Sequence, residues 1–86
     1  MRKEKMYSIG DLAKQSGTTI RTNQYYENID LLVAKREKNS NLRYYTQSDL
    51  LTLQQILFYK KLDFSLKEIK KYLVDAYPIT LYQFFG

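Results

Sequence analysis

The chain has 86 residues, the length of one small domain. It contains no cysteine and no histidine, which excludes disulfides, thiolate or imidazole metal sites, and catalytic sets built on either residue. Lysine and arginine number 14 against 9 acidic residues, and the net charge of +5 favours a polyanionic partner such as nucleic acid or an anionic membrane surface.

The first predicted helix starts after Tyr7. Ser8 can cap its N-terminus, with Asp11 three residues on as an imperfect capping box. Gly17 suits the left-handed turn that ends such a helix. The apolar face of this helix consists of Ile9, Leu12 and Ala13.

The second predicted helix covers about residues 20–28, with Thr18 or Thr19 as its cap. Two short helices joined by a tight turn that contains glycine are typical of a helix-turn-helix motif.

A β-hairpin is predicted next. Residues 30–33 leave the helix and begin an extended piece, residues 35–41 are polar and turn-rich, and residues 42–45 are aromatic and strand-like. Two extended segments around an Asn/Ser tip are typical of a hairpin, which here would form a wing beside the helix-turn-helix.

Two further helices are predicted after the hairpin. Thr46 and Asp49 open the first, which runs to about Lys61 with the apolar face Leu50, Leu53, Ile56 and Leu57. Ser65 and Glu68 form a capping box for the second, whose predicted buried stripe is Leu66, Ile69 and Leu73. We therefore expect a mainly α, winged helix-turn-helix domain over residues 1–77. Residues 78–86, after Pro78 ends the pattern, would be an apolar tail, the stump of a missing dimerisation or effector region.

Candidate DNA contacts lie on the second helix, because the N-terminal part of that helix enters the major groove in helix-turn-helix proteins. Arginine offers a planar fork for guanine edges or phosphate, and threonine and tyrosine hydroxyls bond phosphate oxygens. The alternative is an ordinary amphipathic helix with a polar solvent face, and the ring of either Tyr25 or Tyr26 could equally belong to the core. The candidates are Thr18, Thr19, Arg21, Thr22, Gln24 and Tyr25.

The predicted hairpin concentrates positive charge. Lys35, Arg36, Lys38 and Arg43 against Glu37 give four minus one, or +3 of the net +5. Such a cluster can clamp the DNA backbone, although charged turns are often only solvated loops.

The remaining charged residues have simpler explanations available. Lys60, with Lys61, could contact phosphate or serve the helix dipole. Lys67, Lys70 and Lys71 are interpreted as a solvent face. The acidic residues Glu27, Asp30, Asp49 and Glu68 are interpreted as surface, turn or cap residues.

The ordered set of motifs resembles the DNA-binding domain of the MerR family, over roughly residues 6–74. It is carried by Tyr7-Ser8-Ile9-Gly10-Asp11-Leu12-Ala13-Lys14, Thr19-Ile20-Arg21, Tyr25-Tyr26-Glu27, Leu31-Leu32, Arg43-x-Tyr45-Thr46, Asp49-Leu50 and Phe64-Ser65-Leu66-x-Glu68-Ile69. The resemblance implies a homodimer on a pseudo-palindromic promoter. It also implies that double-stranded promoter DNA is distorted so that RNA polymerase can engage two elements held apart by an overlong spacer.

Carried over by position, the resemblance implies DNA contacts by Arg21, Tyr25, Arg43 and Tyr45, a supporting role for Tyr26, and a basic residue near the backbone at Lys60. Some positions depart from the family pattern. Asn23 stands where leucine is usual, and Gln24 replaces an arginine. Asp30, Asn41 and Asp63 stand where glycine is common, and Asp and Asn tolerate the left-handed backbone better than most residues.

Two other functions fit the same features. One is an excisionase-like architectural protein that bends DNA, and the other is a basic helical module that binds an acidic protein partner. We expect no enzyme, metal or cofactor, because nothing in the sequence assembles a nucleophile, a base and an oxyanion site. No apolar run approaches the roughly 20 residues of a membrane span, and no signal segment follows the basic N-terminus, so a cytoplasmic, nucleoid-associated location is expected.

Overall fold

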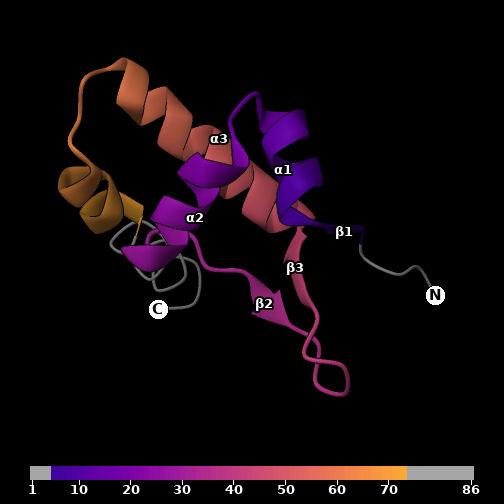
Figure 1. Cartoon of the computed structure of the whole chain (residues 1–86). Coiled ribbons are helices and arrows are strands. Elements are labelled where there is room, and N and C mark those ends of the chain that lie inside the picture. Colours follow the sequence, from indigo (N-terminus) through magenta and orange to yellow (C-terminus); the bar gives the residue numbers. More distant parts are fainter. Residues whose placement is uncertain (1–4, 74–86) are drawn as a thin grey trace, which may run out of the picture. The chain divides into compact units, whose positions relative to one another are not determined.

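The computed structural model describes residues 5–73 of the chain. The elements are β1 Met6–Tyr7, α1 Ile9–Ser16, α2 Ile20–Asn28, β2 Lys35–Arg36, β3 Arg43–Thr46 and α3 Gln47–Lys61, followed by helical residues 66–73 (Figure 1). This order is the predicted winged helix-turn-helix. Contacts divide the chain into two compact units, Met1–Gln55 and Ile56–Gly86, with the boundary inside α3. The predicted tail at residues 78–86 lies outside the described residues.

The helix-turn-helix is closed by the caps that the sequence predicts. Ser8 Oγ accepts the backbone N–H of Asp11 at 3.0 Å, and Gly17 ends α1 in the left-handed conformation with a φ of 74°. Thr19 caps α2 by accepting the N–H of Thr22 at 3.0 Å. Each side chain satisfies a backbone donor that a helix start would otherwise leave free.

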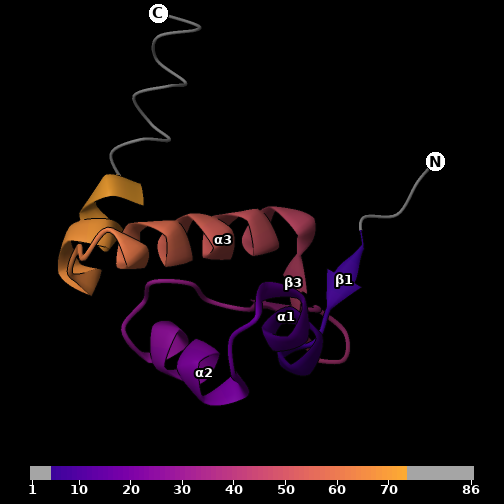
Figure 2. The ribbon, with the colours of Figure 1, turned by 90° about the horizontal axis from the view of Figure 1, so that it is seen from above.

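A small antiparallel sheet in the order β1-β3-β2 supports the wing. Figure 2 shows β1 beside β3, where Met6 pairs with Thr46 and Tyr7 with Tyr45. The sequence did not predict β1, which is two residues long and is defined by backbone pairing.

The first strand of the hairpin lies later than predicted. Residues 30–33 are not a strand, because the N–H groups of Leu31 and Leu32 both bond to the carbonyl of Tyr26, at 2.8 and 3.3 Å. The end of α2 therefore takes the backbone donors that a strand would have used. The strand β2 falls instead at Lys35–Arg36, inside the segment predicted as the tip.

The core includes most of the predicted apolar faces. In the first unit Leu12, Leu50 and Leu53 are buried, together with Leu31 and Leu32 from the segment after α2, and in the second unit Ile56 and Ile69 are buried. Leu57, Leu66 and Leu73, predicted in the same stripes, are half-buried.

The capping box at the start of the last helical segment is confirmed. The N–H of Ser65 donates to Glu68 Oε1 at 2.9 Å, and the N–H of Glu68 donates to Ser65 Oγ at 3.1 Å. The bond from the Ser65 backbone lowers the pKa of the Glu68 carboxyl. The positive-φ turns are also as predicted, at Asp30 (59°), Asn41 (60°) and Asp63 (67°).

Asn23, on α2, is a polar residue in the core, with an exposed fraction of 1%. Its Nδ2 donates to Thr18 Oγ1 at 2.8 Å and to the Thr19 carbonyl at 2.9 Å. Its Oδ1 is buried without a hydrogen-bond partner in the described part of the chain. A buried acceptor in this state costs about 1–3 kcal/mol of folding free energy.

We therefore expect Asn23→Leu to raise the free energy of unfolding by about 1–2 kcal/mol, because it removes the orphan oxygen and buries an apolar side chain. Thr18 Oγ1 keeps its bond to Ser16, and the Thr19 carbonyl keeps its bond to the backbone N–H of residue 23. Chemical denaturation monitored by circular dichroism measures the change. A loss of stability would mean that the amide bonds of Asn23 outweigh its unpaired oxygen.

Candidate nucleic-acid interface

The exposed face of α2 carries three polar side chains one turn apart. Arg21, Gln24 and Tyr25 occupy positions i, i+3 and i+4 of one helix and are exposed, Tyr25 by 52%. Within residues 5–73 the Arg21 guanidinium has no ion-pair or hydrogen-bond partner, so its donors are available to a ligand.

The three threonines of α2 and its cap are used mainly within the chain. Thr18 Oγ1 is shared between Ser16 and Asn23. Thr19 Oγ1 donates to Thr22 Oγ1 at 2.9 Å while it accepts the Thr22 N–H. Thr18 and Thr19 thus hold the turn, and Thr22, which is half-buried, keeps its own hydroxyl proton for a partner.

Two of the tyrosines that the sequence placed near DNA belong to the core. Tyr26 is 5% exposed, and burial, followed by Tyr25, raises the pKa of its hydroxyl, which fits the supporting role expected for it. Tyr45 is 1% exposed, and its hydroxyl oxygen has no partner at hydrogen-bond geometry within the described residues. Burial, and then the carboxylates of Glu27 and Asp49, raise its pKa. The expected DNA contact of Tyr45 needs surface that this side chain does not have, and we correct its role to packing beneath the wing.

Lys35 anchors the wing. Its Nζ donates to both carboxylate oxygens of Asp49 at 2.9 Å. The Asp49 side chain is 10% exposed, and its Oδ2 also accepts the Thr46 N–H at 2.8 Å as the cap of α3. The positive charge of Lys35 is therefore neutralised by a residue of the same chain, and the wing offers less free charge than the sequence count of +3 suggests.

Arg36 and Arg43 face one another across the wing. They are register partners on β2 and β3, and both are exposed. Directly opposite residues on antiparallel strands share a face, and like charges there are destabilising, by about 0.2–1 kcal/mol on the scale of such pairs. Arg36 Nη1 donates only to Asn41 Oδ1, at 3.3 Å, among the described partners. An anion bound between the two guanidinium groups would relieve this repulsion.

The wing tip is ordered by Glu37. Its Oε1 accepts the N–H groups of Asn39 and Ser40, both at 2.9 Å, and these bonds lower the pKa of its carboxyl. Lys38 is exposed at this tip and has no ion-pair or hydrogen-bond partner in the part of the chain that the structure describes.

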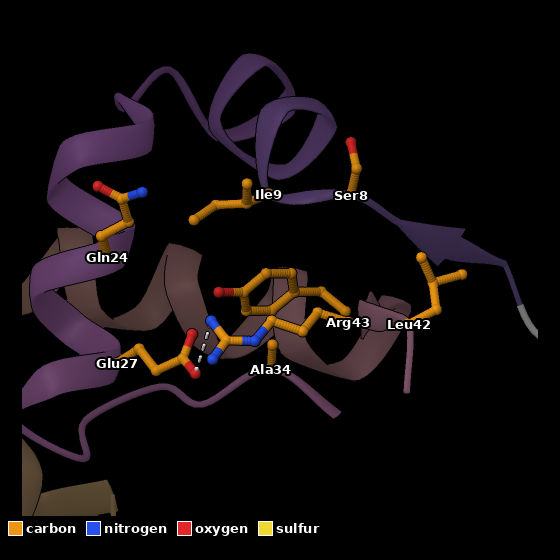
Figure 3. Close-up of a pocket in the computed structure, with 8 residues that line it drawn as sticks. Ser8, Ile9, Gln24, Glu27, Ala34, Leu42 and Arg43 are labelled. Carbon is orange, nitrogen blue, oxygen red and sulfur yellow. Dashed lines mark ion pairs between the residues drawn. The ribbon is translucent and has the colours of Figure 1, made fainter. Parts of the chain in front are cut away.

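A hollow of about 250 Å³ lies between α1, α2 and the wing (Figure 3). Gln24 and Glu27 line it from α2, Ala34 and Arg43 from the hairpin, and Ser8 with Ile9 from the start of α1. Across it, Glu27 Oε2 lies 3.4 Å from Arg43 Nη1. Glu27 was interpreted from the sequence as a plain surface residue. The one sequence feature that could have indicated a role at the interface is that Glu27 is the sole acidic residue of α2.

Lys60 is exposed in the last turn of α3, together with Lys61. A lysine there favours the negative end of the helix dipole whether or not it touches DNA. Among residues 5–73 no cluster of acidic side chains could hold a metal ion, and no helix has the length and apolar character needed to cross a membrane.

The profile described as MerR HTH family regulatory protein matches residues 7–75. The chain is 44% identical over 69 residues to the HTH-type transcriptional activator TipA of Streptomyces coelicolor, covering 80% of this chain and 27% of that protein. It is 43% identical over 67 residues to the HTH-type transcriptional activator mta of Bacillus subtilis, covering 78% of this chain and 26% of that protein. The chain thus spans about a quarter of the length of these curated relatives.

Solved structures give the same picture of the fold. The HTH-type transcriptional regulator SkgA from Caulobacter crescentus superposes with a TM-score of 0.79 at 35% identity, covering 87% of this chain and 54% of that one. The N-terminal part of the Bacillus subtilis multidrug transporter activator, MtaN, superposes with a TM-score of 0.71 at 43% identity, covering 78% and 63%.

Proposed function

The chain belongs to the MerR family of helix-turn-helix regulatory proteins and forms their DNA-binding domain, and we propose that α2 and the wing bind promoter DNA. The observation that carries the proposal is the exposed pair Arg36 and Arg43 on opposite strands of the wing. Two like charges held in register favour an anion, and the repeating phosphates of DNA supply one.

The residues divide into two roles. Arg21, with Gln24 and Tyr25 on the same helix face, enters the major groove, where an arginine fork pairs with a guanine edge. Arg36, Lys38 and Arg43 grip the backbone, which positions the domain without reading sequence.

In the whole protein, we propose, two such domains act as a homodimer on a pseudo-palindromic promoter. They distort the DNA between its two elements so that RNA polymerase can engage both. Two recognition helices must then lie about 34 Å apart, one turn of DNA. This activity would place the protein on the nucleoid in the cytoplasm.

The test compares Arg21→Ala with Arg43→Ala on two duplexes, one selected on the wild-type chain from a random pool and one scrambled. Arg21→Ala should cost about 1–3 kcal/mol on the selected duplex and less on the scrambled one, because a base contact is lost. Arg43→Ala should weaken both duplexes alike, because a phosphate contact is lost. Fluorescence anisotropy measures all four affinities.

Lys67→Ala provides the control, because Lys67 is exposed on the helical residues 66–73 and was assigned to solvent. It should leave both affinities unchanged. Equal losses for Arg21→Ala on the two duplexes would remove its base-reading role. Binding of poly-glutamate as tightly as of DNA would favour the protein-interaction alternative.

A further inference from the structure

This inference rests on the proposed function and concerns Glu27, an acidic residue among the groups assigned to DNA. Glu27 lines the hollow between α2 and the wing and is the only acidic residue to do so among residues 5–73. A carboxylate placed there repels the DNA phosphates. Since this repulsion opposes DNA binding, we expect Glu27 to have another effect, through the wing arginine beside it, that favours binding.

The ion pair itself is too loose to be a strong stabilising contact. The distance from Arg43 Nη1 to Glu27 Oε2 is 3.4 Å, whereas charge-assisted bonds of this kind are about 2.7–2.9 Å long. The Arg43 side chain is also 57% exposed, so water screens the attraction. Removing the pair should therefore change the free energy of unfolding little.

The pair instead restricts the arginine. A free arginine side chain loses up to about 2 kcal/mol of rotamer entropy when a ligand fixes it. Glu27 is half-buried, with its side chain 19% exposed, and it points across the hollow toward Arg43 (Figure 3). Of the five N–H donors of a guanidinium, one faces Glu27, and the others stay available to a phosphate.

Two further residues line the hollow beside Glu27. Tyr45 lies two residues beyond Arg43 on β3 and so shares its face of the strand, and within the described residues its buried hydroxyl has no partner at hydrogen-bond geometry. Gln24, one turn before Glu27 on α2, lines the same hollow. A single carboxylate thus stands between the recognition helix, the wing arginine and the buried tyrosine.

We propose that Glu27 is a positioning residue for DNA binding: its carboxylate holds the Arg43 guanidinium against α2, so that the wing and the recognition helix present their donors to one stretch of backbone. Because the ion pair already restricts Arg43, this side chain loses less rotamer entropy when DNA binds. The Glu27 carboxylate also repels the phosphates, and the proposal requires that the entropy effect be the larger of the two.

The test uses Glu27→Gln, Arg43→Ala and the double variant of the 86-residue chain, on a mixed-sequence duplex of about 24 base pairs, roughly two turns of DNA. Electrostatics alone predicts that Glu27→Gln tightens binding and steepens the salt dependence, because net charge rises by one. Positioning predicts the opposite sign. Binding should weaken about threefold to tenfold, and the slope of log affinity against log salt should fall in size by about 1.

The double variant isolates the pair. In the Arg43→Ala background, Glu27→Gln should have no effect or should tighten binding, because no arginine remains to be positioned. Equal weakening in both backgrounds would overturn the proposal in favour of a general structural role. Tighter binding by Glu27→Gln alone would overturn it in favour of plain repulsion.

Asp30→Asn is the matched control, since it also removes one acidic charge, here from an exposed position, and asparagine tolerates the φ of 59° at this position. It should leave binding unchanged or slightly tighter. Glu27→Asp, which keeps the charge but shortens the reach, should weaken binding as Glu27→Gln does, and it serves if the glutamine variant does not fold. If the wild-type chain shows no salt-dependent binding to DNA, the proposed function itself is overturned. If the wild-type chain binds DNA, and Arg43→Ala weakens this binding but Glu27→Gln does not, only the present inference is overturned.

Discussion

Replacement of Asp49 by alanine is expected to lower the free energy of unfolding by about 3 kcal/mol. The change removes the acceptor of the buried Thr46 N–H at the start of α3, a cap of the kind worth about 1 kcal/mol. It also leaves the Lys35 ammonium without its partner. The lysine side chain is 48% exposed and can regain water, which keeps the total below that of a fully buried pair.

Urea denaturation of Asp49→Ala beside the wild type measures this loss. Glu68→Ala is the matched control, because Glu68 caps the next helical segment in the same way but from an exposed position, and its loss should be smaller. Lys35→Met should account for part of the Asp49 effect, and the two changes together should cost less than their sum. Equal losses from Asp49→Ala and Glu68→Ala would show that burial and the lysine contribute nothing.

Binding to duplex DNA is expected to weaken about 40-fold when the salt concentration rises from about 50 to 200 mM. Three cations carry the expectation, namely Arg36, Lys38 and Arg43, which are the residues assigned to the DNA backbone. Each phosphate contact releases close to one counterion, so three contacts give a slope near −2.7 in log affinity against log salt. A fourfold rise in salt lowers the affinity by the factor that this slope gives.

Anisotropy titrations at four or more salt concentrations give the slope. Arg36→Ala should reduce its size by about 1, because one phosphate contact is lost. Lys35→Met, measured where circular dichroism shows the variant folded, should leave the slope unchanged, because Asp49 already neutralises that lysine. A flat salt response of the wild type would contradict the clamp formed by the wing.

The helices were predictable because their signals are local. Three helices start at a capping residue whose side-chain oxygen accepts the backbone N–H three residues later, namely Ser8, Thr19 and Ser65. Gly17 indicates the turn after α1, because glycine adopts the left-handed conformation more readily than most residues. Such contacts lie within one turn of the chain and can be recognised in the sequence without knowledge of the fold.

The interface was predicted less well, because its decisive contacts join distant residues. Lys35 and Asp49 are 14 positions apart, and only the fold shows that a wing lysine is used internally. Glu27 meets Arg43 only after the hairpin folds toward α2. Tyr45 fits the family pattern of a DNA contact, but it pairs with Tyr7 of β1, 38 positions earlier in the chain, and its side chain is buried.

The ion pairs of Lys35 and Arg43 have a consequence for exchanging wings between relatives. Each strand of the hairpin carries one ion pair, from β2 to the start of α3 and from β3 to α2. The intervening residues 37–42 carry neither ion pair. A chimaera that grafts only this loop should keep the hairpin in place and change its reach along the DNA. A graft that includes positions 35 and 43 must bring Asp49 and Glu27 with it, because Asp49 is the partner of Lys35 and Glu27 is the residue proposed to position Arg43.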